Sequence, residues 1–81
     1  MNRTPMKLFK VTYQTEVVIL AESEAEAISN AGRYAGDEAR ELLGWELVEH
    51  MSQIPNWTGC IPYSAYREYN KEEKRCEEFL V

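Results

Sequence analysis

The sequence predicts a small two-layer α+β domain, in which a two- to three-stranded sheet is packed by one long helix and followed by a short C-terminal helix. Three observations carry this prediction: alternating apolar residues over 9–21, a helix-starting motif at Ser23, and an apolar stripe with helical spacing after it. Alternation with a period of two indicates a strand, and spacings of three and four indicate a helix. The sheet and the helix can bury their apolar sides against each other.

Residues 9–21 are typical of sheet, as one strand or as two. One parity holds Phe9, Val11, Tyr13, Thr15, Val17, Ile19 and Ala21, and the other begins with Lys10, Thr12, Gln14 and Glu16. This pattern predicts a sheet with one face packed against a core and the opposite face largely exposed to water. Unbroken parity favours a single bent strand over about 7–21. Ordinary strand length favours two antiparallel strands divided by an odd-length turn near Gln14-Thr15, and we prefer this division.

The long helix is expected to begin after Ser23, because Ser23-Glu24-Ala25-Glu26 is a capping box. Its apolar stripe consists of Ile28, Ala31, Ala35, Ala39 and Leu42. The small residues at 31, 32, 35 and 36 predict a close approach to the sheet. Leu43-Gly44 supplies a C-terminal stop. Alternatively the helix breaks at Gly36-Asp37, since a glycine inside a helix costs up to about 1 kcal/mol.

The rest of the chain predicts a strand, a loop and a second helix. Trp45 to Met51 is the strand candidate, with Trp45, Leu47 and Val48 as core contributors, and Pro55 ends it. Residues 55–66 contain two prolines and a glycine, which indicates a loop. A second capping box at Asn70-Lys71-Glu72-Glu73 predicts the final helix, whose apolar edge is Cys76, Phe79 and Leu80.

The chain is expected to form one domain over residues 6–81, preceded by a flexible N-terminal tail at 1–5. A sheet of two or three strands has open edges, and an open edge can pair with another chain. A homodimer formed by sheet continuation or by helix packing is therefore one of the two oligomeric states that the sequence leaves open.

Fourteen acidic and nine basic residues give a formal net charge of −5. Phosphate contacts need clustered Lys and Arg, so this balance argues against direct nucleic-acid binding. No apolar run approaches the roughly 18 residues of a membrane span. Lys7 and Lys10 interrupt the one apolar stretch where a signal peptide would lie. We expect a cytoplasmic protein without membrane association, in which Cys60 and Cys76 are free thiols.

The sequence predicts no enzyme, no metal site and no cofactor. His50 is the single histidine, and a general base needs a partner within hydrogen-bond reach. The spacing of Cys60, Cys76 and His50 matches no usual zinc pattern. A nucleophilic Cys60 would need electropositive neighbours to lower its pKa, and the sequence offers none nearby.

Two groups of residues are candidates for binding a partner. The first is an aromatic loop, Trp57, Tyr63, Tyr66 and Arg67, followed by Tyr69, of residue types that anchor interfaces and stack on bases. The second is the acidic segment, defined as Glu72, Glu73, Glu77 and Glu78. Each has a purely structural alternative: the aromatic side chains close a small core, and the glutamates form a solvated face.

The opening Lys-Leu-Phe-Lys-Val-Thr-Tyr strand, running into Ala-Glu-Ser-Glu-Ala-Glu-Ala, resembles many small proteins of phages, prophages and plasmids. In size, acidity and strand-then-acidic-helix organisation the chain is similar to some anti-CRISPR inhibitors, over residues 6–50. The resemblance implies a binding protein of a mobile element that blocks a host defence complex by occupying its surface. It supplies no active-site motif to carry over.

The leading hypothesis is thus a non-enzymatic protein-binding inhibitor or adaptor that acts on a host nucleic-acid-targeting defence complex through an acidic and aromatic surface. A second hypothesis is a small-molecule or nucleotide sequestrant that uses Trp57, Tyr63, Tyr66 and Arg67. A third is a small enzyme centred on His50 and Cys60.

Overall fold

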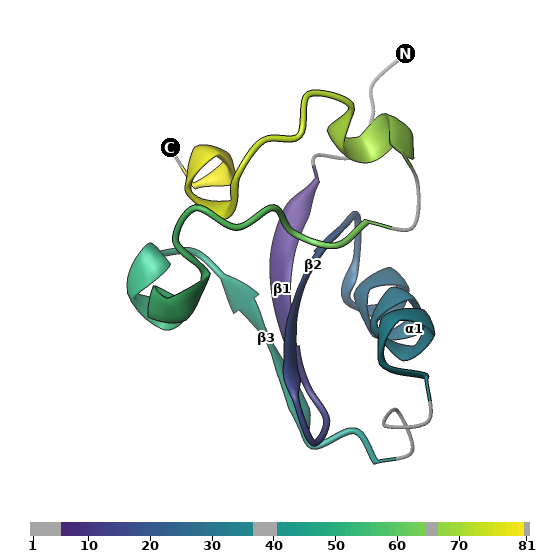
Figure 1. Ribbon diagram of the computed structural model, residues 1–81. Helices are drawn as coiled ribbons and strands as arrows, with labels where there is room; N and C mark the ends of the chain where they lie inside the picture. Colours follow the sequence, from purple (N-terminus) through teal and green to yellow (C-terminus); the bar gives the residue numbers. More distant parts are fainter. Residues whose placement is uncertain (1–5, 37–40, 65–66, 81) are drawn as a thin grey trace.

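The computed structural model describes residues 6–36, 41–64 and 67–80, so the predicted tail at 1–5 lies outside the described residues. Its sheet is antiparallel, with strand order β2-β1-β3. The strands are β1 (Lys7–Thr12), β2 (Glu16–Ala21) and β3 (Gly44–Val48), and the helix α1 (Glu24–Ala35) lies against the sheet (Figure 1). The predicted α+β fold, with a small sheet packed by one helix, is confirmed.

A three-residue turn joins the first two strands. The register pairs Thr12 with Glu16, and the Tyr13 N–H donates to the Thr15 carbonyl at 2.9 Å inside the turn. With an odd-length turn, the odd-numbered residues of both strands point to the same face of the sheet, so Phe9 lies opposite Ile19 on that face. The division into two strands is confirmed, and the single strand over 7–21 is wrong.

Helix α1 begins and ends at signals that the sequence contains. The Ser23 hydroxyl oxygen accepts from the Glu26 N–H at 3.3 Å, which satisfies one of the free amides of the first turn. Gly36 has φ 61° and its N–H donates to the Gly32 carbonyl, a conformation that glycine adopts without strain. The helix therefore ends before 37, so the longer helix to Leu43-Gly44 is wrong. Leu42 is 43% exposed, and Ala39 lies outside the described residues.

Between α1 and the sheet lies the first core cluster. The helix contributes two small residues, Ala27 and Ala31, that are at most 1% exposed. The sheet and its turn contribute Phe9, Val11, Tyr13, Val17, Ile19 and Ala21. Tyr13 is buried and its hydroxyl lies 3.4 Å from the Ile28 carbonyl, to which it donates. The predicted close approach of the helix is thus made through alanine.

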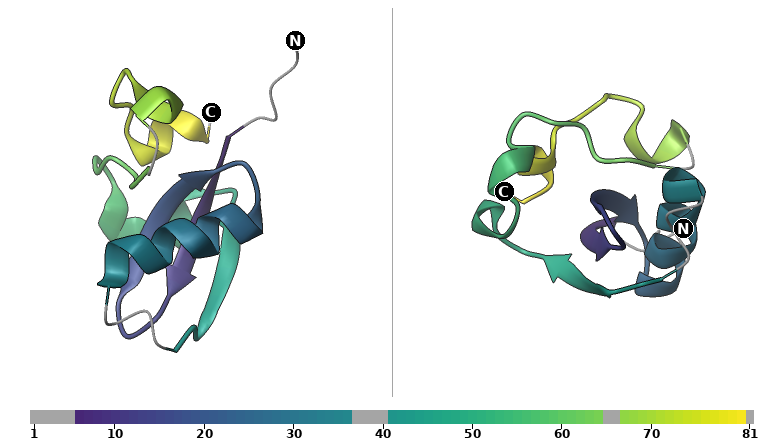
Figure 2. Two further views of the ribbon diagram at one scale, coloured as in Figure 1. Left: turned by 90° about the vertical axis from the view of Figure 1, so that its right-hand side faces the viewer. Right: turned by 60° about the horizontal axis from the view of Figure 1, so that its bottom comes forward.

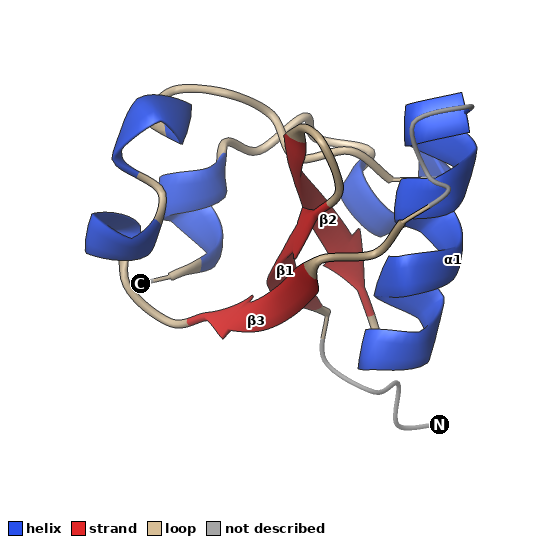
Figure 3. Cartoon of the chain, turned by 90° about the horizontal axis from the view of Figure 1, so that it is seen from below, coloured by secondary structure: helices blue, strands red, loops and turns tan. Residues whose placement is uncertain are grey.

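The opposite face of the sheet is partly exposed around Lys10, Glu16 and Glu46, as expected, but its other end is buried, and there the expectation of a largely exposed face is wrong. It carries the second core cluster: Leu8, Val18, Leu20, Val48, Ile54 and Cys76, each at most 3% exposed. Short 3-10 turns cover it, namely η2 (Met51–Gln53), η3 (Pro55–Trp57) and η5 (Cys76–Phe79). Figure 2 shows α1 along one face, and Figure 3 shows the sheet between α1 and these turns. The physical reason is β2, whose Val17–Ala21 is apolar on both parities, as in strands covered on both sides.

The predicted helix after Asn70 is replaced by a loop and a single 3-10 turn. The Asn70 side chain accepts from the Lys74 N–H at 2.8 Å and donates to the Lys74 carbonyl at 3.0 Å. Such local bonds compete with helix formation. Turn η5 follows, with the Arg75 N–H donating to the Glu78 carboxylate at 2.7 Å. The predicted apolar edge is confirmed, because Cys76 is buried and Phe79 and Leu80 pack against the second cluster.

Candidate interaction surface

The described residues of the aromatic loop do not form one surface. Trp57 is half-buried against the second core cluster. Tyr63 packs against the first cluster, on the other face of the sheet, and its ring meets that of Tyr34 edge-on at 5.0 Å. Tyr66 and the side chain of Arg67 lie outside the described residues. Trp57 and Tyr63 therefore do not share a stacking pocket, and both help to close the core.

The acidic segment divides into two glutamates whose carboxylates accept from backbone N–H groups, Glu77 and Glu78, and two that make no such bond within the described residues, Glu72 and Glu73. Both carboxylate oxygens of Glu77 accept from the Gly59 N–H, at 3.0 and 3.2 Å, and Glu78 caps η5. Glu72 and Glu73 are exposed, and Glu72 lies 3.4 Å from the Lys74 ammonium. Contact of this segment with a partner stays a prediction, for which Glu72 and Glu73 are the accessible groups.

His50 and Cys60 are both exposed, and no hydrogen bond joins their side chains in the part of the chain that the structure describes. The carbonyl of Cys60 instead accepts from the Cys76 N–H at 3.0 Å. Both cysteines are free, as predicted. Burial raises the pKa of the Cys76 thiol to about 11, with smaller contributions from Cys60 and Glu77. The buried thiol is thus kept protonated at neutral pH.

An open groove lies where α1 does not cover the sheet. A helix is about 10 Å wide and strands lie about 4.8 Å apart, so one helix covers about two strands. Helix α1 packs on β1 and β2. The uncovered part, called the β3 groove, has a volume of about 310 Å³ and is lined by Lys7, Phe9, Glu22, Ser23, Glu24, Trp45 and Leu47.

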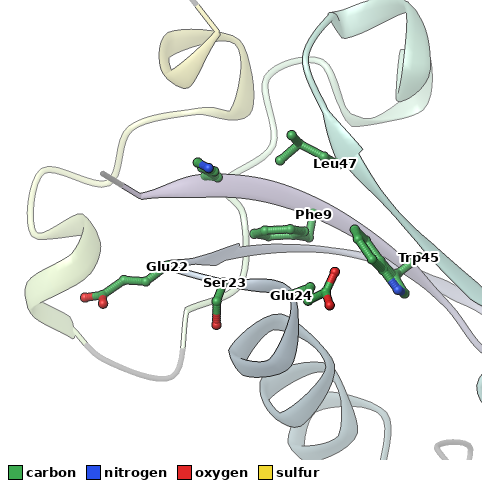
Figure 4. Close-up of a pocket in the computed structure, with 7 residues that line it drawn as sticks. Phe9, Glu22, Ser23, Glu24, Trp45 and Leu47 are labelled. Carbon is green, nitrogen blue, oxygen red and sulfur yellow. The ribbon is translucent and has the colours of Figure 1, made fainter. Parts of the chain in front are cut away.

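The floor of the β3 groove is apolar. Figure 4 shows Phe9, Trp45 and Leu47 along it, with Glu24 at the start of α1 nearby. The Phe9 and Trp45 rings lie 5.9 Å apart at 58°. Trp45 is 41% exposed, so its prediction as a buried core residue is wrong, whereas Val48 is buried as predicted.

Two glutamates, one lysine and one serine form the polar part of the β3 groove. Glu22 and Glu24 flank the cap residue Ser23, and Lys7 begins β1. The Tyr69 hydroxyl donates to the Glu22 carboxylate at 3.4 Å. Burial, followed by the charges and hydrogen bonds of Glu26 and Glu22, raises the pKa of Tyr69 to about 12. The start of α1 therefore carries negative charge beside an apolar floor.

On the second face, one ion-pair network joins the three strands. The Lys10 ammonium lies 2.7 Å from the Glu46 carboxylate and 3.5 Å from that of Glu16, and it donates to the Gln53 carbonyl at 3.2 Å. Hydrogen bonding to Lys10, then to Gln53, holds the pKa of Glu46 below its ordinary value of 4.5. Hydrogen bonding to Glu46 raises the pKa of Lys10 above 10.5.

This network predicts a pH-dependent effect of Glu46→Gln. A lowered carboxyl pKa gives stability that is present above pH 4.5 and is lost as the pH falls through the lowered pKa. Because Glu46 is 45% exposed, the variant should lose only about 0.2–1 kcal/mol of unfolding free energy at pH 7. The loss should shrink as the pH is lowered from 7 to 3. Urea unfolding at both pH values measures it, and an equal loss at both would contradict the assignment.

No protein-family model matches the chain, and neither a curated protein nor a solved structure matches it. Among the described residues, no helix has the length and apolar character needed to cross a membrane. The described part of the chain also holds no group of three or more His, Cys, Asp or Glu residues arranged to bind a metal ion.

Proposed function

We propose that the protein is a non-enzymatic inhibitor or adaptor that binds another protein, and that its partner is a host complex that targets nucleic acid in defence. The observation that carries this proposal is the β3 groove, which combines an apolar floor, exposed at Trp45, with carboxylates at its side. An apolar pocket with a few polar groups at its margin is the usual form of an anchor site at a protein interface.

The apolar floor supplies the affinity in this proposal. A partner side chain such as Leu, Met or Phe would contact Phe9, Trp45 and Leu47, and its full burial would contribute about 1.5–3 kcal/mol. Phe9 is 4% exposed and held by the first core cluster, so the floor is formed before the partner arrives. A preformed site avoids part of the entropy cost of ordering an interface.

In this proposal, the negative charges of the protein determine which kind of partner it prefers. The chain has a net charge of −5, and Glu22 and Glu24 stand at the groove. Proteins that handle nucleic acid carry clustered Lys and Arg on the surface that meets phosphate. An acidic protein is attracted to that surface, and its binding there excludes the nucleic acid. This is the mode of action that the resemblance to anti-CRISPR inhibitors implies.

Capture from host lysate with charge-reversed baits tests the proposal. The wild-type chain should retain one complex in stoichiometric amount, and the purified complex should lose target nucleic-acid binding when the chain is added. The double variant Glu22→Lys/Glu24→Lys should reduce capture at least about tenfold, because it reverses the charge beside the groove. Circular dichroism checks that this variant keeps its fold.

The matched control is Glu72→Lys/Glu73→Lys, which makes the same change in net charge on the acidic segment. Retained capture by this control, together with loss at the groove variant, supports the groove as the anchor. Loss at the control alone would place the contact on the acidic segment and overturn the role of the groove. Equal capture by all three baits, or a captured complex that still binds its nucleic acid, would contradict the proposed function.

A further inference from the structure

The two edges of the sheet differ in whether another segment hydrogen-bonds to them. The outer edge of β2 is covered by Tyr63, whose N–H donates to the Val18 carbonyl and whose carbonyl accepts from the Leu20 N–H, both at 2.9 Å. Strand β3 has β1 as its one strand neighbour among the described residues. It contains no Lys and no Pro, the residues that commonly protect an edge from pairing.

Gln53 limits the open part of the β3 edge. Its carboxamide donates to the Leu47 carbonyl at 3.0 Å and accepts from the Glu49 N–H at 2.7 Å, as a residue of a neighbouring strand would. The end of β3 is therefore already occupied. The stretch that remains open within the strand is Gly44–Glu46, with Trp45 at its centre.

We propose that a second copy of this chain pairs with the β3 edge, antiparallel and in the register that places Trp45 opposite Trp45 of the second copy. The product is a two-fold symmetric dimer with a continuous six-stranded sheet. A two-fold interface uses the same patch on both copies, so the patch must complement itself. In this register Glu46 stands opposite Gly44 of the second copy.

The side chains favour this register over its neighbours. Trp45 is 41% exposed, and an aromatic pair directly across two strands is among the favourable cross-strand pairs. A register centred on Glu46 would oppose two carboxylates, which is destabilising. A register centred on Leu47 would need the backbone groups that Gln53 occupies. Leu42 and Leu43, 43% and 67% exposed, extend the apolar surface beside the pairing stretch.

The dimer would present both β3 grooves on one face of the six-stranded sheet, because a two-fold axis normal to a sheet preserves its faces. The use of both grooves by a partner rests on the proposed function, whereas dimer formation does not. Pairing of a short strand buries little area, so the association is expected to be weak. The net charge of −5 on each copy opposes it, so added salt should strengthen it.

Sedimentation equilibrium of the purified chain tests the pairing without any partner protein. The weight-average mass should rise from 9.4 kDa toward twice that value as the concentration rises from about 5 μM to about 500 μM, the range expected of a small interface. Trp45→Lys should remain monomeric throughout. Ile61→Lys, at an exposed apolar residue outside the sheet, should associate as the wild type does.

Substitutions at Gly44 test the register and do not disturb the Trp45 ring. A Cβ at Gly44 meets nothing within 4 Å in the described structure, so the fold accepts a side chain there. Gly44→Lys should tighten the dimer, since it places an ammonium opposite Glu46 of the second copy, and Gly44→Glu should weaken it. Each substitution should change the dimer dissociation constant by about 2- to 30-fold, because the two-fold axis creates two identical pairs. A wild-type chain that stays monomeric, or a dimer insensitive to Gly44 and Trp45, would overturn the proposal.

Discussion

Replacement of Leu20 by alanine should destabilise the protein by about 2–5 kcal/mol, a large part of its total stability. Leu20 is 0% exposed and belongs to the second core cluster, on the face of the sheet away from α1. A domain of this length is stable by about 4–12 kcal/mol, so the variant should be partly unfolded at the upper end of the range. Urea unfolding followed by circular dichroism measures the difference.

The control for Leu20→Ala is Leu43→Ala, the same change at a residue that is 67% exposed. It should alter the unfolding free energy by no more than about 0.5 kcal/mol. A small effect at Leu20, equal to that at Leu43, would mean that the C-terminal turns do not cover this face of the sheet.

Cys76→Asp should destabilise the protein by about 3–5 kcal/mol at pH 7, because it leaves an uncompensated carboxylate in an apolar cluster. Cys76 is 0% exposed, and its cluster contains Leu8, Val18 and Leu20. Burial raises the pKa of a carboxyl group, so the destabilisation should shrink as the pH is lowered toward 4 and the group is protonated. Urea unfolding at pH 7 and at pH 4 measures both effects.

The chain provides a matched control in Cys60→Asp, since Cys60 is exposed and its backbone bonds that of Cys76. This substitution should change the unfolding free energy by about 0.5 kcal/mol or less. Equal costs at the two positions would show that η5 is not packed against the sheet in solution.

The first half of the fold could be predicted because its signals are local. Strand length favoured a division by an odd-length turn near Gln14-Thr15 over the single strand that parity favoured, and the register that pairs Thr12 with Glu16 confirms the division. Ser23 caps α1 as expected. The end of the helix at Gly36 was one of two alternatives, and the glycine conformation decides between them.

The second half of the fold was predicted less well, because its structure depends on contacts between segments that are distant in the sequence. The alternating pattern hid that β2 is apolar on both parities, so Val18 and Leu20 were not recognised as a second core face. Asn70 satisfied the motif for a helix start but bonds Lys74 within a loop, which the motif alone does not distinguish. Only the covering turns η2, η3 and η5 show that much of this second face is buried.

The candidate site could be predicted only in part from the sequence, because it too depends on how distant segments pack. The aromatic residues of the loop suggested one cluster, but Trp57 and Tyr63 lie on opposite faces of the sheet. The β3 groove exists because α1 is narrower than the sheet, which is a property of packing. Glu24 was recognised only as part of the capping box, and Glu22 was assigned no role from the sequence. The signal that could have revealed an uncovered strand is the ratio of one predicted helix to three strands, because one helix covers about two strands.

Chemical-shift mapping of the isotope-labelled chain, titrated with its captured and purified partner, tests most directly whether the β3 groove is the recognition surface. We expect the largest shifts on the Trp45 indole N–H, on Leu47 and on the amides of residues 22–24, and smaller changes at Glu72 and Glu73. Shifts confined to the acidic segment, with the Trp45 indole signal unmoved, would contradict this expectation.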